Sequence, residues 1–244
     1  ADPLDHGAIV ENAMMYPDGK FDLDDERLTP NSRASYPPTY LSNIKDGSTS
    51  DHPKTILFLT ADANGVLPPI ARLNPEQAML WFLMGYTSKL SHTEPGIVDP
   101  VSTFSRFFAE PFMPRNPDVY ASMLGEKMGK YSTQVYLVNT GWSGGPFGIG
   151  ARMDINLTRA IVNAALSGEL EDAEYVEDKI FHIMVPKEIE GVPSKVLFAK
   201  NTWEDKDAYD ERAEKLAQDF SDHFDEAYGD KNIDPAVEAQ CPGK

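Results

Sequence analysis

The stretch that decides the fold spans residues 135–152 and reads VYLVNTGWSGGPFGIGAR. It begins with β-branched and aromatic residues, continues with a loop that holds five glycines, and leads into a helix-like segment. Strand, glycine-rich loop and helix in this order form a layout that cradles phosphate groups. However, no GK[ST] tripeptide, which would complete a phosphate-binding loop, occurs in the chain. From the pattern alone, the loop fits a tight structural turn as well as a ligand site.

Strand and helix signals alternate on both sides of this stretch. The apolar runs at residues 54–60 and 134–139 are typical of strands that are buried on both faces. The sequence NPEQ at 74–77 supplies a helix cap, a proline and a capping-box glutamine, and it predicts a helix to about residue 89. This alternation predicts an α/β fold. Further helices are predicted at 117–130, 158–166 and 205–228, and two short strands at 9–16 and 20–23 around a turn.

The composition limits the classes of function. The 244 residues carry a net charge of −17, which argues against a nucleic-acid or anionic-membrane surface. No apolar run reaches the roughly 18 residues that a membrane span needs, and the first ten residues do not resemble a signal peptide. Cys241 is the only cysteine, and the five histidines show no short metal-binding spacing. We therefore expect a cytoplasmic protein without metal ligands in this chain.

A series of separate motifs extends along most of the chain. Together they resemble the C-terminal part of ATP-dependent phosphoenolpyruvate carboxykinase over roughly residues 8–228. The motifs are NSRASYP at 31–37, FLTAD at 58–62, GVLPP at 65–69, TE at 93–94, TFS at 103–105, NTGWSGG at 139–145, RM at 152–153 and TRA at 158–160. Members of that family are lyases that convert oxaloacetate and ATP to phosphoenolpyruvate, carbon dioxide and ADP with the help of divalent metal ions.

The resemblance has consequences for the fold and the domain organisation. It implies a mixed-sheet mononucleotide-binding domain of the phosphoenolpyruvate carboxykinase type that lacks its phosphate-loop segment. Residues 1–244 would form the adenine side and the lid of that domain, with a poorly ordered tail at 229–244. Residues 86–108 resemble the mobile lid of the family. The strands at 54–60 and 134–139 are expected to lack some of their neighbours, which a missing N-terminal part would supply.

The resemblance also implies roles for individual residues. Arg33 looks like the arginine that contacts the transferred phosphoryl group, and the alternative is a surface arginine paired with an acidic residue. Arg152 resembles the residue that stacks on adenine, Met153 the residue that packs against the base, and Thr158 the residue that hydrogen-bonds the base. The alternative for Met153 and Thr158 is a helix start, with a core-filling methionine and a hydroxyl in the first turn.

Several positions depart from the family pattern. Ala151 and Asn156 stand where basic residues are usual, Asp154 stands where serine is usual, and Arg106 stands at a lid position that is commonly cysteine. The loss of two positive charges and the gain of a negative one are expected to weaken the binding of a polyanion.

Two functions from different classes follow. The first is a working carboxykinase of gluconeogenesis or C4-acid metabolism. It would use ATP and Mn²⁺ or Mg²⁺, with the metal ligands on a preceding segment or a separate chain, so that the present chain alone is inactive. The second is a truncated, non-catalytic relative that serves as a structural or interaction subunit. Arg33, Arg152 and Thr158 favour the first function, whereas the absent phosphate loop and the changes at positions 151, 154 and 156 favour the second.

Overall fold

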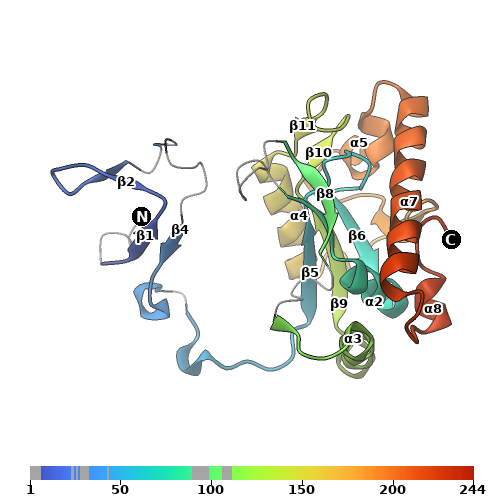
Figure 1. The fold of residues 1–244 in the computed structure, drawn as a ribbon, viewed down its shortest axis with the longest axis horizontal. Coiled ribbons are helices and arrows are strands. Elements are labelled where there is room, and N and C mark those ends of the chain that lie inside the picture. The colour runs from blue at the N-terminus through green and yellow to red at the C-terminus, as the bar shows by residue number, and fades with distance from the viewer. Residues whose placement is uncertain are drawn as a thin grey trace. The chain divides into compact units, whose positions relative to one another are not determined.

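The structure is a computed structural model that describes residues 7–22, 25, 27, 33–42, 44–89, 99–105 and 112–244 (Figure 1). Its contacts divide the chain into two compact units. Residues 1–51 and 89–100 belong to the first unit, and residues 52–88 and 101–244 to the second. In the described part of the chain, no helix is both long enough and apolar enough to span a membrane.

The described residues of the first unit form two small antiparallel pairs of strands. Strand β1 (Ile9–Glu11) pairs with β4 (Arg33–Ser35), and β2 (Met14–Met15) pairs with β3 (Phe21–Asp22) around the predicted turn. The strand expected at 9–16 is therefore broken in two. The break lies at Asn12, whose φ of 60° is left-handed and incompatible with a continuous strand. Two short 3₁₀ turns follow, η1 (Pro38–Tyr40) and η2 (Asp46–Ser48).

The second unit is built on a mixed sheet, as the resemblance implied, and this sheet has five strands among the described residues. The strand order is β12 (Tyr175–Asp178), β13 (Ile183–Pro186), β6 (Ile70–Leu73), β9 (Gln134–Asn139) and β5 (Thr55–Thr60). Strands β5 and β9 are parallel, and the other pairs are antiparallel.

The two apolar strands, which were expected to lack neighbours, differ in their pairing. Strand β9 is paired on both sides, with β5 and with β6, so the expectation was wrong for this strand. Strand β5 pairs only with β9 among the described residues, and Leu59 on β5 is 59% exposed. The sheet thus presents an apolar edge strand at β5.

The first long helix, α2 (Pro75–Met84), begins as predicted and ends earlier. Asn74 and Gln77 form a reciprocal capping box, with hydrogen bonds of 2.8 and 2.9 Å. The predicted extension to residue 89 was wrong, because Gly85 adopts a left-handed conformation (φ 54°) and ends the helix. The chain continues as strand β7 (Tyr86–Lys89), which pairs with β8 (Val101–Phe104).

The remaining helices lie close to their predicted positions. Helix α3 spans Pro117–Tyr131, α4 spans Ile155–Ser167 and α7 spans Lys206–Tyr228. Helix α4 starts three residues before the predicted position because the Asp154 carboxylate caps it. Short helices occur at α5 (Ser194–Leu197), α6 (Ala199–Thr202) and α8 (Pro235–Glu238).

Two hydrophobic clusters cover the two faces of the sheet. Val135 and Leu137 of β9 join the larger cluster with α2 and α7, whereas Tyr136 and Val138 join the smaller one with α4. This division follows from the alternation of side chains along a strand. Figure 1 accordingly shows α4 on the opposite side of the sheet from α2 and α7.

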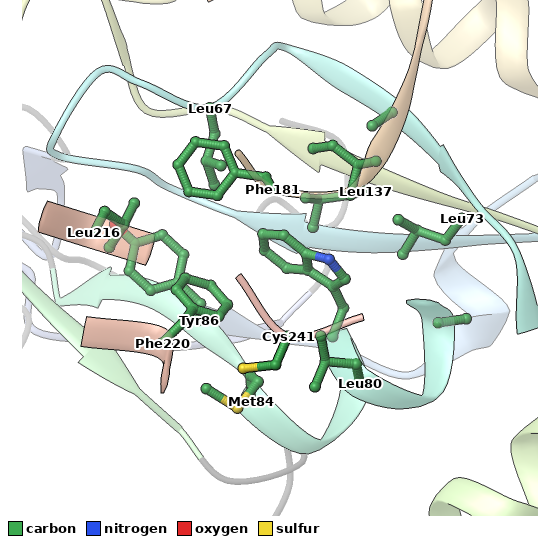
Figure 2. Close-up of a cluster of buried hydrophobic side chains, with 14 of the residues drawn as sticks. Leu67, Leu73, Leu80, Met84, Tyr86, Leu137, Phe181, Leu216, Phe220 and Cys241 are labelled. Carbon is green, nitrogen blue, oxygen red and sulfur yellow. The ribbon is translucent and has the colours of Figure 1, made fainter. Parts of the chain in front are cut away.

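The C-terminal tail differs from the expectation of poor order. Val237 and Cys241 are buried in the larger cluster, where Cys241 lies among side chains of α2 and α7 (Figure 2). The Lys244 ammonium group forms ion pairs with Asp225 at 2.6 Å and Glu238 at 2.7 Å. Apolar burial and these two ion pairs hold residues 229–244 against the domain.

Candidate nucleotide-binding site

The site begins where β9 ends, at the buried side chain of Asn139. Its Oδ1 accepts hydrogen bonds from the amides of Asp62 (3.0 Å) and Gly141 (2.8 Å), and its Nδ2 donates to the Leu67 carbonyl (3.0 Å). A Cβ at Gly141 would lie only 2.3 Å from backbone atoms of Asp62. The Asn-Thr-Gly motif therefore locks the end of β9 to the loop between β5 and β6 (residues 61–69).

The glycine-rich stretch forms a compact hairpin, here called the glycine hairpin (residues 142–152). Strand β10 (Trp142–Ser143) pairs with β11 (Ala151–Arg152) at its base. A Cβ at Gly150 would lie 2.2 Å from the Gly145 carbonyl oxygen. This glycine therefore permits close backbone packing inside the hairpin, which is the tight-turn function that the pattern left open.

Arg152 is held at the base of the glycine hairpin by two contacts. Its Nε donates to the Thr140 carbonyl at 2.5 Å, and its guanidinium carbon lies 4.9 Å from the centre of the Trp142 ring. Partial burial lowers the pKa of Arg152 from its ordinary value, although a guanidinium group remains charged at neutral pH. Arg152 thus presents an oriented, planar cation.

A pocket of about 320 Å³ lies beside this hairpin, a volume in the range of small-molecule sites. Arg152 and Met153, two of the three predicted adenine residues, both line it. The third, Thr158, is not among the lining residues, and its hydroxyl donates to the Asp154 carbonyl at 3.3 Å. In this structure Thr158 therefore has the alternative role, that of a hydroxyl in the first turn of α4.

Two other lining residues change the electrostatics of the pocket. Asp154 lines the pocket, and its carboxylate accepts hydrogen bonds from the amides of Asn156 (2.7 Å) and Leu157 (3.3 Å). Lys195 on α5 also lines the pocket and adds a positive charge. No local signal marks Lys195, because only the fold brings α5 to the pocket.

Arg33, the predicted phosphoryl-contacting residue, lies on β4 in the first unit. Its side chain is 67% exposed, and its Nε lies 2.7 Å from Glu11 Oε1. In this structure Arg33 is thus a surface arginine that pairs with an acidic residue, which was the alternative to the phosphoryl-contacting role.

The lid-like segment is described only in part. Strands β7 and β8 lie within it, whereas Thr93, Glu94 and Arg106 lie outside the described residues. Across the described positions, no group of three or more His, Cys, Asp or Glu side chains is arranged to hold a metal ion.

The fold and the pocket define the general class of the protein: a mixed α/β domain with a ligand-sized pocket beside a glycine-rich hairpin. The sequence model of a protein family, described as phosphoenolpyruvate carboxykinase, matches residues 2–195 of this chain. A phosphoenolpyruvate carboxykinase (ATP) of Caldanaerobacter subterraneus subsp. tengcongensis is 52% identical over 225 residues, or 91% of this chain and 43% of that relative. Relatives with the same name from Alkaliphilus oremlandii and Thermus thermophilus are 49% and 50% identical over 96% and 89% of the chain.

This chain belongs to the ATP-dependent phosphoenolpyruvate carboxykinase family. The resemblance in the sequence motifs is thereby confirmed. The chain spans less than half the length of these relatives, between 41% and 46% of each.

Proposed function

We propose that this chain is the C-terminal part of an ATP-dependent phosphoenolpyruvate carboxykinase and forms its adenine side and lid. The reaction is the conversion of oxaloacetate and ATP to phosphoenolpyruvate, carbon dioxide and ADP, in gluconeogenesis or C4-acid metabolism in the cytoplasm. The observation that carries the proposal is that Arg152 and Met153 line one pocket beside the glycine hairpin, in a chain of this family.

The pocket has the chemistry that an adenine ring requires. Thr140 and Trp142 restrict the Arg152 guanidinium, so stacking on a purine would cost little further side-chain entropy. Met153 provides a polarizable apolar surface beside the ring. Thr158 would bond the base after its hydroxyl leaves the Asp154 carbonyl, a bond that is long at 3.3 Å. Lys195 partly replaces the positive charge that Ala151 lacks.

Arg33 would act on the transferred phosphoryl group. Phosphoryl transfer spreads negative charge over the equatorial oxygens, and a guanidinium group can pair with two of them. Arg33 must then exchange its exposed ion pair with Glu11 for the phosphoryl group. Exposed ion pairs contribute at most about 1 kcal/mol, so this exchange is inexpensive.

The divalent metal ion and the phosphate loop would be contributed from outside residues 1–244. Mn²⁺ or Mg²⁺ would neutralise charge on the phosphates when bound. The present chain alone would therefore neither bind the catalytic metal nor turn over oxaloacetate. Its partners would be ATP, oxaloacetate and the N-terminal part of the enzyme.

A non-catalytic, structural or interaction subunit is the second candidate. It is favoured by Asp154, which adds a negative charge to the pocket, and by Ala151, which offers none of the positive charge usual there. The two candidates differ in nucleotide binding, which the second does not require.

The test is ATP binding by the complete protein that contains this chain, measured by calorimetry with Mg²⁺ present. Arg152→Ala is expected to weaken ATP binding by about fivefold to thirtyfold, the equivalent of a cation–π contact of roughly 1–2 kcal/mol. Arg115→Ala, at an exposed position before α3, is the matched control and should bind as the parent does. Equal affinities of the two variants would contradict the adenine assignment, and a parent that binds no ATP would favour the second candidate.

A further inference from the structure

The side chain of Asn64, in the loop at residues 61–69, connects three different elements. Its Nδ2 donates to the Tyr86 hydroxyl on β7 at 3.0 Å and to the Ser102 hydroxyl on β8 at 3.1 Å. Its Oδ1 accepts from Nη1 of Arg212 on α7 at 3.0 Å. Both N–H donors and the carbonyl oxygen of this amide are thus engaged.

The hydrogen bonds around Asn64 have a fixed direction because of Asp62. The buried Asp62 carboxylate accepts from the Tyr86 hydroxyl at 2.7 Å and from the amides of Asn64, Val66 and Leu67 at 2.8–3.0 Å. Burial, followed by the negative charge of Asp62, raises the pKa of Tyr86 well above its ordinary value, so the hydroxyl stays protonated. Since its proton points to Asp62, the Tyr86 oxygen accepts from Asn64.

The same loop supports the glycine hairpin. The Trp142 amide donates to the Asp62 carbonyl at 2.9 Å, and the Phe147 amide donates to the Ala63 carbonyl at 2.9 Å. The loop at 61–69 is therefore held by the hairpin through its backbone and by β7 and β8 through the side chains of Asp62 and Asn64.

Strands β7 and β8 differ in how they are attached to the end of β5. Strand β7 has its own bonds, from the Thr60 hydroxyl to the Tyr86 carbonyl (2.8 Å) and from the Ala63 amide to the Ser88 hydroxyl (3.1 Å). Strand β8 pairs with β7 and packs Phe104 against Phe220 of α7, and its hydrogen bond to the loop at 61–69 runs from Asn64 to Ser102. Loss of the Asn64 amide should thus loosen β8 more than β7.

We propose that Asn64 is a positioning residue that fixes the base of the β7–β8 pair against the loop beneath the glycine hairpin. Arg212 holds the amide in the orientation that presents both N–H groups to the two hydroxyls. The functional part of this inference rests on the proposed function, in which β7 and β8 belong to the lid of the nucleotide site. The positioning itself depends only on the contacts around Asn64.

The test uses hydrogen exchange of the complete protein. Asn64→Leu keeps the approximate shape and removes both donors and the acceptor, and Asn64→Asp keeps the acceptor but lacks the donors. We expect amides 101–105 to exchange about fivefold faster in both variants, the effect of one lost hydrogen bond, with a smaller change at 86–89. Asn163→Ala, at an exposed position on α4, is the control and should leave both segments unchanged.

A double-mutant cycle makes the assignment specific. Ser102→Ala should accelerate exchange at 101–105 in the parent, and it should add little in the Asn64→Leu background, because both changes remove the same bond. Full additivity of the two changes, or equal exchange in Asn64→Leu and Asn163→Ala, would overturn the positioning role.

Steady-state kinetics then separate this inference from the proposed function. Asn64→Leu should lower kcat about threefold or more, while the Kd for ADP stays within about twofold of the parent, because no contact with the adenine pocket is lost. Faster exchange at β8 together with an unchanged kcat would refute the link to catalysis and leave the positioning intact. A parent without nucleotide binding would refute the proposed function, whereas the exchange data would still decide the role of Asn64.

Discussion

Asp154 has two effects of opposite sign, and one substitution separates them. Its carboxylate caps α4 through the amides of Asn156 and Leu157, and it also places a negative charge in the pocket proposed for ATP. Loss of an N-cap costs about 1 kcal/mol. A charge at an exposed site interacts with another by at most about 1 kcal/mol, or up to about fivefold in Kd.

Serine caps helices about as well as aspartate and has no charge. Asp154→Ser should therefore leave the free energy of unfolding within about 0.5 kcal/mol of the parent and tighten ATP binding by about twofold to fivefold at low salt. Asp154→Ala should tighten binding equally and lower the free energy of unfolding by about 1 kcal/mol. The gain in affinity should shrink at high salt, because exposed charges are screened.

The assays are calorimetric titration with ATP and urea unfolding of the complete protein. Asp205→Ser is a matched control, because Asp205 caps α7 in the same way, with hydrogen bonds of 3.0 Å, and does not line the pocket. An unchanged or weaker affinity in Asp154→Ser would refute the reasoning. An equal gain in Asp205→Ser would show that only net charge matters.

Three further predictions concern other parts of the chain. Arg33→Ala should lower kcat of the complete enzyme strongly, and Arg33→Lys should restore it only in part because the paired donors are lost; an unchanged kcat in the alanine variant would contradict the role. Burial raises the pKa of Cys241 to about 12, so a thiol reagent at pH 8 should label it only on unfolding, and rapid labelling of the native protein would contradict this burial. Residues 1–244 expressed alone should self-associate through the β5 edge and lack carboxykinase activity; a stable monomer with well-protected β5 amides, or measurable turnover, would refute these claims.

Much of the fold could be predicted because local signals and tertiary structure agree. The apolar run at 134–139 became β9 with the same bounds, and the capping box placed the start of α2 correctly. Strands β6, β12 and β13 were missed, since four-residue strands carry little periodicity. The end of α2 differs from the prediction because Gly85 adopts a left-handed conformation that ends the helix.

Of the candidate site, only the residues that lie next to the glycine-rich stretch in the sequence could be predicted. Arg152 and Met153 lie in the motif itself and line the pocket together. Lys195 and Asn64 could not be assigned from local patterns, because their contacts depend on α5 and α7 packing near the loops at the ends of β5 and β9. Thr158 stays a prediction, since its hydroxyl bonds its own helix in this structure.

The most direct test of the central claim is a crystal structure of the complete protein with a non-hydrolysable ATP analogue and Mg²⁺. The account predicts the adenine ring in the pocket beside the glycine hairpin, with the Arg152 guanidinium within about 6 Å of the ring centre and Met153 against its edge. An adenine ring bound elsewhere, with this pocket empty, would contradict the account.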